Sequence, residues 1–214
     1  MSIIVEFYPQ LVAGLEVTLQ LIVCAVPLGI AIGIVIALLR AYGGSVISVI
    51  AYVYQILFRG TPLLLQLFII YYGLPRVGIV FGPVTAAIIG FGLCSGAYHS
   101  EYLRGALLSV SLGETEAARS LGMSKLQTIT SIIVPQMIRR AIPGCSNEIT
   151  YLIKYSSLAY LVTVIDLTGQ GRLIAYKTFR FFDTFLIVGL IYLILVTISN
   201  YFLRYAENKM RIPG

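Results

Sequence analysis

The feature that most constrains this chain is a set of long apolar stretches, the first of which runs from Val17 to Leu39 without a charged side chain. At about 1.5 Å per residue, a helix of this length crosses a hydrocarbon core of about 30 Å. Only 11% of the residues are charged, whereas soluble domains carry about a quarter. Backbone in lipid forms helices or a closed barrel, and barrel strands alternate apolar with polar residues. The continuous stretches therefore predict an all-α polytopic membrane protein.

The distribution of the apolar stretches predicts a single transmembrane domain over residues 1–214 with five spans. We place them at approximately 11–39, 46–74, 77–108, 136–165 and 184–206. The second span is interrupted by Arg59, Gly60, Thr61 and Pro62. Because proline removes a backbone donor and disfavours helix at the preceding residue, we expect one broken helix there. Gly29 and Gly33 form a G-x-x-x-G pair, which predicts ordinary close packing of the first span.

The basic residues predict the orientation, because lysine and arginine concentrate in cytoplasmic loops. One side of the membrane receives Arg40, Arg104, Arg119, Lys125, Arg139, Arg140, Arg204, Lys209 and Arg211. The other side receives Arg76, Arg172, Lys177 and Arg180. We therefore expect the N-terminus outside and the C-terminus in the cytoplasm. The first ten residues lack the basic n-region of a cleavable signal, so the first span is expected to be retained.

Several functions are excluded by the same pattern. The net charge of +6 comes from residues that orient helices, so we expect no nucleic-acid partner. The cysteines, Cys24, Cys94 and Cys145, are widely spaced in apolar surroundings and predict neither a disulfide framework nor a metal site. A phosphate-binding loop needs a Gly-Lys pair, and the sequence contains none. The chain is therefore not expected to hydrolyse ATP itself.

The stretch between the third and fourth spans, about 109–135, is the most informative part of the sequence. Ser111 with Glu114, and Ser124 with Gln127, have the spacing of capping boxes. Gly122 stands where a helix commonly ends in a left-handed residue. We expect two short helices joined by a tight turn, the second ending at Pro135. Such a unit either lies in the membrane interface or protrudes and docks into the groove of a partner.

The same stretch resembles the EAA loop of bacterial ABC importer permeases. The resemblance rests on Glu116, Ala117, Ala118, Gly122, Ile133 and Pro135. Three further segments, Arg59–Pro62 with Gln66, Tyr98–Gly105 and Asn147–Leu158, resemble the branch that takes up polar amino acids of the histidine, arginine, lysine and glutamine type. The resemblance covers essentially the whole chain. Glu148 departs from it, because this branch has apolar, aromatic or amide residues there more often than an acid.

The resemblance implies the five-span fold of a type I importer permease that pairs with an identical or similar permease and works by alternating access. The residues implied to couple to a cytoplasmic ABC ATPase are Glu114, Glu116, Ala117, Ala118, Arg119, Leu121, Gly122 and Met123. Two such ATPase subunits would hold ATP and magnesium, and this chain would bind no cofactor and act as a transport subunit, not as an enzyme. A binding protein outside the bacterial cytoplasmic membrane would deliver the amino acid.

Ionisable residues inside the predicted spans indicate the substrate pathway. A charge at the bilayer centre costs about 2.5–3.5 kcal/mol and therefore faces protein or a water-filled cavity. Carboxylates at Glu101 and Glu148 suit an ammonium group or a cationic side chain, whereas Lys154 and Ser157 suit a carboxylate. We add as polar contacts Asn147, Thr61 and Gln66. This set favours a basic amino acid over glutamine or glutamate. Glu101 also has Arg104 three positions on, a pair that alone can anchor a helix end.

Two other classes of protein remain as alternatives. One is a secondary transporter driven by an ion gradient, with Glu101 and Glu148 as coupling sites. Such folds usually contain internal repeats with two matching broken helices, and only one break is visible here. The other is a channel subunit or membrane scaffold without coupled energy. Co-purification of an ATPase, and uptake that follows ATP and not a proton gradient, distinguish the importer from both.

Overall fold

The computed structural model describes residues 3–210, and every element in this range is a helix. Short 3-10 and π-helical segments, labelled η, connect the α-helices. In chain order the elements are α1 (Ile3–Tyr42), α2 (Ser45–Gly60), α3 (Leu63–Phe68), η1 (Ile69–Gly73), η2 (Leu74–Val77), α4 (Pro83–Leu108), α5 (Leu112–Ser120), α6 (Lys125–Thr128), η3 (Ile129–Ile133), α7 (Val134–Tyr155), η4 (Ser156–Val162), α8 (Leu167–Thr178) and α9 (Phe181–Met210). The predicted all-α class is confirmed. Arg211, assigned above to the cytoplasmic side, lies outside the described residues.

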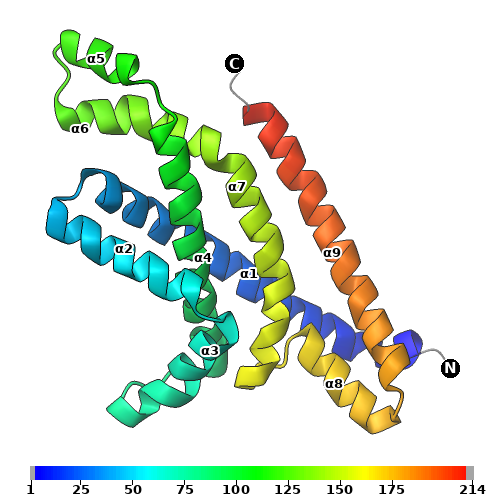
Figure 1. Cartoon of the computed structure of the whole chain (residues 1–214). Helices are drawn as coiled ribbons and strands as arrows, with labels where there is room; N and C mark the ends of the chain where they lie inside the picture. The colour runs from blue at the N-terminus through cyan, green and yellow to red at the C-terminus, as the bar shows by residue number, and fades with distance from the viewer. Residues whose placement is uncertain (1–2, 211–214) are drawn as a thin grey trace.

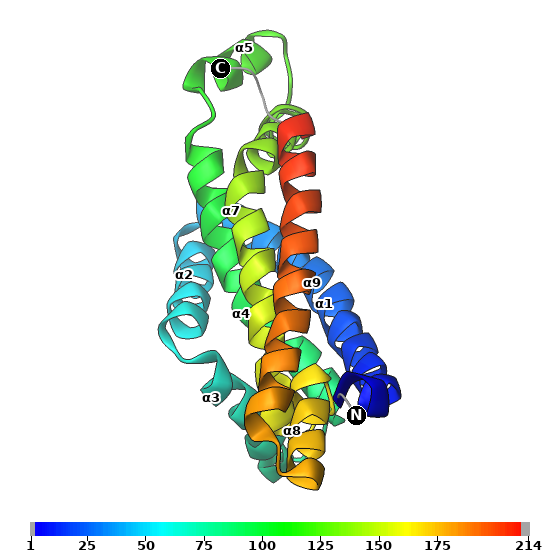
Figure 2. The same cartoon turned by 90° about the vertical axis from the view of Figure 1, so that its right-hand side faces the viewer.

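The helices form an elongated bundle with two distinct ends (Figures 1 and 2). α5, α6 and the last turns of α9 gather at one end, whereas α3, α8 and the first turns of α1 gather at the other. The two termini of the described chain therefore lie at opposite ends of the bundle. An odd number of membrane crossings requires this arrangement.

The helices α1 and α4 form the most extensive helix pair in the described structure. Gly29 and Gly33 make this possible, because a Cβ atom built at Gly33 would lie 2.6 Å from Cβ of His99. At Gly29 it would lie 2.9 Å from Oγ of Ser95. The close packing predicted for the G-x-x-x-G pair is therefore confirmed, and α4 is its partner.

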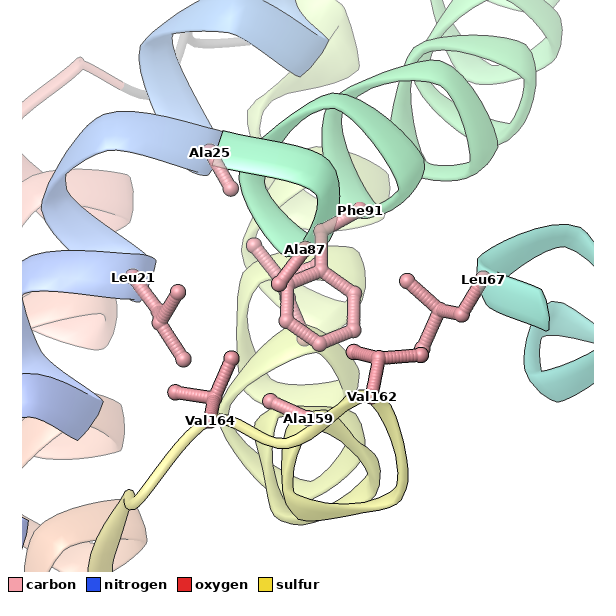
Figure 3. Packing of buried hydrophobic residues seen from close by; sticks show 9 residues of the cluster. Leu21, Ala25, Leu67, Ala87, Phe91, Ala159, Val162 and Val164 are labelled. Carbon is pink, nitrogen blue, oxygen red and sulfur yellow. The ribbon is translucent and has the colours of Figure 1, made fainter. Parts of the chain in front are cut away.

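An apolar cluster between the helices holds the end of the bundle away from α5 (Figure 3). Its buried members come from α1, α3, α4, α7 and the segment after α7, and are Leu21, Ala25, Leu67, Ala87, Phe91, Leu152, Ala159, Val162 and Val164. The ring of Phe91 points into the centre of this group, toward Leu67 and Val162 (Figure 3). Burial of an aromatic ring among aliphatic side chains from several elements fixes their relative positions.

The second predicted span is broken at the expected place. α2 ends at Gly60 and α3 begins at Leu63, and the helix direction changes by 105° between Ser45–Gly60 and Leu63–Val77. Pro62 has extended backbone with φ −60° and ψ 132°, so the α-helical ladder cannot continue through it. The break places the charged side chain of Arg59 at the corner.

Two described helices, α1 and α9, are long and apolar enough to cross a membrane, and the bent pair from Ser45 to Val77 provides a third if it forms one span. α4 and α7 contain 26 and 22 residues, but neither is apolar enough to be counted with these spans. The five spans therefore remain a prediction that depends on α4 and α7. Both helices carry buried polar side chains, among them Ser100 on α4 and Glu148 on α7, so a functional site is expected in the interior of the bundle.

Candidate functional site

The loop between α4 and α7 folds into two short helices, α5 and α6, with a tight turn between them. Gly122 at this turn has φ +79°, the left-handed conformation that was predicted. Ser124 forms a complete capping box with Gln127, also as predicted. The other predicted box is wrong: Ser111 accepts from the backbone N–H of Gly113, and the carboxylate of Glu114 accepts from Nε2 of Gln136 on α7. A long-range contact has replaced the local one.

Pro135 does not end the helix, contrary to the prediction. The chain continues from α6 through the π-helical turn η3 into α7 without a break. The π turn ends at Ile133, so Pro135 occupies the first turn of α7. The hydrogen-bond pattern changes from π to α directly before Pro135, and such a change accommodates a residue that lacks a backbone donor. α5 is thus attached to α7 through a continuous helical segment.

The helix α5 protrudes from one end of the bundle (Figure 2). Of the residues implied to couple to an ATPase, the exposed ones are Glu116, Ala117, Arg119, Leu121 and Gly122, the half-buried ones are Glu114 and Met123, and the buried one is Ala118. Leu112 and Leu121 leave 80% and 83% of their surface exposed. Large apolar side chains exposed on a protruding helix are a surface suited to a protein partner.

Three side chains connect α5 to the bundle. Gln136 on α7 donates to Glu114, and its Oε1 accepts from Nη2 of Arg140 at 3.5 Å. Arg140 in turn donates through Nη1 to the backbone carbonyl of Ser109 at 2.5 Å, just after the end of α4. The position of α5 is therefore tied to both α4 and α7.

In the interior, Glu101 on α4 binds three arginines from three helices. Its Oε2 lies 3.3 Å from Nη1 of Arg40 on α1 and 3.6 Å from Nη1 of Arg59 on α2. Its Oε1 accepts from Nη2 and from Nε of Arg104, the latter at 3.2 Å. Both oxygens of the carboxylate are therefore engaged by guanidinium groups.

A buried polar layer continues from this cluster. Nη1 of Arg40 also donates to Oε1 of Gln55, whose Nε2 donates to Oγ of Ser100 at 2.5 Å. Gln55 and Ser100 are 2% and 0% exposed. Sequence reasoning missed Arg40, Gln55 and Ser100 as site residues. The available signal was Gln55, an amide side chain inside the mostly apolar first half of the broken span.

Glu148 lies on α7 with only 4% of its surface exposed. Its carboxylate faces the hydroxyl group of Ser95 and lies within electrostatic reach of Arg59. Arg59 therefore acts electrostatically on both acidic candidates, Glu101 and Glu148. Asn147 next to it is exposed.

The remaining candidates form two local pairs. Nζ of Lys154 lies 4.8 Å from the ring centre of Tyr151, and the backbone carbonyl of Lys154 accepts from Oγ of Ser157 at 2.7 Å. Thr61 and Gln66 bind each other, with Nε2 of Gln66 2.9 Å from Oγ1 of Thr61. Among the described residues no ion pair joins Glu148 to Lys154. Arg59 thus contacts Glu101 and lies within electrostatic reach of Glu148, whereas Lys154 and Ser157 form a separate pair.

A cavity of about 600 Å³ opens beside the Glu101 cluster, lined by residues of α1, α2 and α4. Its polar lining includes Arg40, Gln55, Arg59, Glu101 and Arg104. Within residues 3–210 no group of three or more histidine, cysteine, aspartate or glutamate side chains is placed to hold a metal ion. The polar groups of the interior are therefore suited to bind a charged organic molecule by hydrogen bonds and ion pairs.

Comparison with known proteins agrees with the geometry. Residues 29–212 match the family described as "Binding-protein-dependent transport system inner membrane component". The chain is 39% identical to the "Probable amino-acid ABC transporter permease protein YckA" of Bacillus subtilis, over 96% of this chain and 91% of that protein. It is 35% identical to the "Glutamine transport system permease protein GlnP" of Escherichia coli K12, with 95% and 94% covered. A crystal structure of an amino acid ABC transporter with histidines superposes with a TM-score of 0.88 at 33% identity, covering 96% of both chains.

Proposed function

Because this chain belongs to the family of binding-protein-dependent transport system inner membrane components, and is the permease subunit of an amino-acid ABC importer, we propose that it carries polar, preferentially basic, amino acids into the bacterial cytosol. It does so as a dimer with an identical or similar permease in the cytoplasmic membrane, with its N-terminus outside and its C-terminus inside. The dimer alternates between inward-open and outward-open packings, which is a rigid-body switch between discrete arrangements.

ATP and magnesium act on two ABC ATPase subunits, into which the residues around α5 dock. The support for this role is the surface of α5, where exposed leucines flank Glu116 and the left-handed turn at Gly122 sets the direction of the chain. An extracytoplasmic binding protein delivers the amino acid at the opposite end. This chain is a transport subunit and carries no catalytic residue of its own.

The observation that carries the substrate proposal is the burial of Glu148. A carboxylate that is 4% exposed on a predicted spanning helix needs a cationic partner or a water-filled cavity. The carboxylate of Glu101 is already neutralised by three arginines, so Glu148 is the acid better placed to attract an ammonium or guanidinium group. The relatives are named for several amino acids, glutamine and nopaline among them, so the preference for a cation depends on this residue.

The test is uptake of labelled arginine and of labelled glutamine by proteoliposomes that contain the permease, its ATPase and its binding protein. We expect arginine uptake to depend on ATP and to be inhibited by lysine and histidine more than by glutamine or glutamate. Glu148→Gln should lower arginine uptake about tenfold, the loss of one charge-assisted contact, and should spare glutamine. Glu16→Gln, the same change at an exposed position of α1, is the control. An equal decrease in arginine uptake and glutamine uptake by Glu148→Gln would contradict the preference for basic amino acids.

A further inference from the structure

The Glu101 cluster contains more positive than negative charge. The cavity beside it is lined by three guanidinium groups, those of Arg40, Arg59 and Arg104, and by one carboxylate. Glu148 is a second carboxylate within reach of Arg59, but it does not line the cavity. Even with Glu148 counted, one cation is in excess. A net charge in a partly desolvated site is costly unless an opposite charge balances it.

The arginines retain donors that Glu101 does not use. A guanidinium group has five N–H donors, and Nε of Arg40 is buried without a hydrogen-bond partner among residues 3–210. Arg59 approaches Glu101 only through Nη1, at 3.6 Å, and its side chain is 40% exposed at the edge of the cavity. The remaining nitrogens of Arg59 are therefore available to a molecule in the cavity.

Aromatic rings hold two of the guanidinium groups in place. The guanidinium carbon of Arg40 lies 4.7 Å from the ring centre of Tyr52, and that of Arg59 lies 5.3 Å from the ring centre of Tyr98. Both tyrosines line the same cavity. Stacked arginines have little rotational freedom left to lose, so they are preorganised to bind a planar anion with two parallel hydrogen bonds. The planar anion that an amino acid carries is its carboxylate.

We propose that the cavity between α1, α2 and α4 binds the carboxylate group of the transported amino acid, with Arg59 as its main ligand. This inference rests on the proposed function, because it takes an amino acid as the cargo. The cavity, with a volume of about 600 Å³, accommodates a whole amino acid. Glu148, to which the substrate preference assigns a cationic side chain, does not line this cavity and is not needed for the carboxylate site. Every amino acid carries this carboxylate, so the site does not depend on the nature of the side chain.

The test uses a fluorescent reporter, which is feasible because the chain contains no tryptophan. Ile56 lines the cavity, and Ile56→Trp is introduced into the complete importer in phosphatidylcholine nanodiscs, with the complex lacking this change as background. Iodide, an anionic quencher, is compared with acrylamide, a neutral one. We expect iodide to quench the introduced indole preferentially, and arginine and glutamine to protect against it equally. Agmatine, which is arginine without its carboxylate, should not protect.

Arg59→Gln in the reporter background should weaken protection by arginine about tenfold, which corresponds to one charge-assisted hydrogen bond. Arg76→Gln, the same change at an exposed position outside the cavity, should leave protection unchanged. Arg59→Lys keeps the charge but loses the planar fork, and should give an intermediate result even where Arg59→Gln fails to fold.

Equal protection by agmatine and by arginine, or equal protection by arginine in Arg59→Lys and in the parent reporter, would overturn the proposal. In nanodiscs with phosphatidylglycerol, protection of the indole from iodide without added amino acid would also overturn the proposal. That result would assign the cavity to a lipid phosphate.

If glutamine protects as well as arginine while glutamine and arginine are transported equally, the preference for basic substrates fails and the carboxylate site stands. If arginine is preferred in transport but agmatine protects fully, the carboxylate site fails and the substrate preference stands. The two proposals are therefore tested separately.

Discussion

Nε2 of Gln66 on α3 donates to the backbone carbonyl of Phe58 on α2 at 2.9 Å, across the break that separates the two helices. It also donates to the backbone carbonyl and to Oγ1 of Thr61, at 3.0 and 2.9 Å. Pro62 interrupts the helical ladder, and without Gln66 the carbonyl of Phe58 would keep, within residues 3–210, only the weak donor Sγ of Cys94, at 3.7 Å. Nε2 of Gln66 and the hydroxyl group of Thr61, residues that sequence reasoning assigned to the substrate pathway, are thus engaged in the break itself, whereas Oε1 of Gln66 is buried without a partner among the described residues.

Replacement of Gln66 by leucine is expected to destabilise the permease. Gln66 is 6% exposed, and the substitution removes its hydrogen bonds to the carbonyls at the break, at a cost of about 1 kcal/mol. Thermal unfolding of the detergent-solubilised importer should show a lower midpoint. Gln20→Leu, the same change at an exposed position of α1, is the control and should alter the midpoint little. Identical midpoints for the two variants would show that the side-chain bonds contribute nothing to the break.

The helix break and the coupling turn could be predicted because each depends on backbone chemistry within a few residues. Pro62 follows Gly60 and disfavours helix at Thr61 between them, a local combination that Pro27 and Pro143, which lie inside helices, do not have. Gly122 follows a run of good helix formers at a position that favours φ > 0. The capping box at Ser124 is equally local. Predictions of this kind require no knowledge of which helices pack together.

The Glu101 cluster could not be predicted in the same way. Arg40 and Glu101 are 61 positions apart, and their contact depends on the packing of α1 against α4. The sequence pattern assigned Arg40 to a cytoplasmic loop and Arg59 to the helix break, which are reasonable roles for each residue alone. The failed capping box at Ser111 has the same origin, because Glu114 is drawn to Gln136 on another helix. The spacing of residues along the chain does not show when a contact with another helix will replace a local hydrogen bond.

The contact between α1 and α4 leads to a second prediction. A methyl group at Gly33 would lie 2.6 Å from Cβ of His99 and 3.1 Å from the backbone nitrogen of Ser100, so Gly33→Ala must displace α4. We expect a loss of about 1–3 kcal/mol, as for other overpacked sites. Gly189 on α9 has open space around its Cα, and Gly189→Ala should leave stability unchanged or increase it slightly. The measurement is the unfolding midpoint of each variant, and equal destabilisation by both substitutions would contradict this account.

The turn at Gly122 leads to a third prediction. With φ +79°, a side chain at this position costs about 1–2 kcal/mol. Gly122→Ala should therefore bias the loop away from the conformation that docks and should weaken ATPase binding roughly tenfold. Gly113→Ala places a methyl group at ordinary contact distance inside α5, 3.5 Å from Oγ of Ser111, and is the matched control. Affinity is measured by titrating the purified ATPase against the permease in nanodiscs. Unchanged affinity in Gly122→Ala would remove the turn from the docking surface.

The last prediction concerns the transmission of movement from α5 to the spans. Docking of α5 on the ATPase moves α7 only if contacts between α5 and α7 hold while α5 is displaced. The side chain of Gln136 provides one, because it binds Glu114 on α5 and, through Arg140, the carbonyl of Ser109 after α4. Gln136→Leu should leave ATPase binding intact but lower the number of amino acids transported per ATP hydrolysed several-fold, the effect of losing a hydrogen bond worth about 1 kcal/mol.

Glu114→Gln is the conservative companion, because an amide at this position can still accept from Nε2 of Gln136. It should retain most of the coupling ratio, whereas Glu114→Leu should reproduce the defect of Gln136→Leu. The double variant Glu114→Leu/Gln136→Leu should be no worse than either single variant, since both remove the same hydrogen bond. Additive losses in the double variant would mean that the two side chains act independently, and the path from the ATPase to α7 would then have to pass through the continuous backbone of α6 and η3 alone.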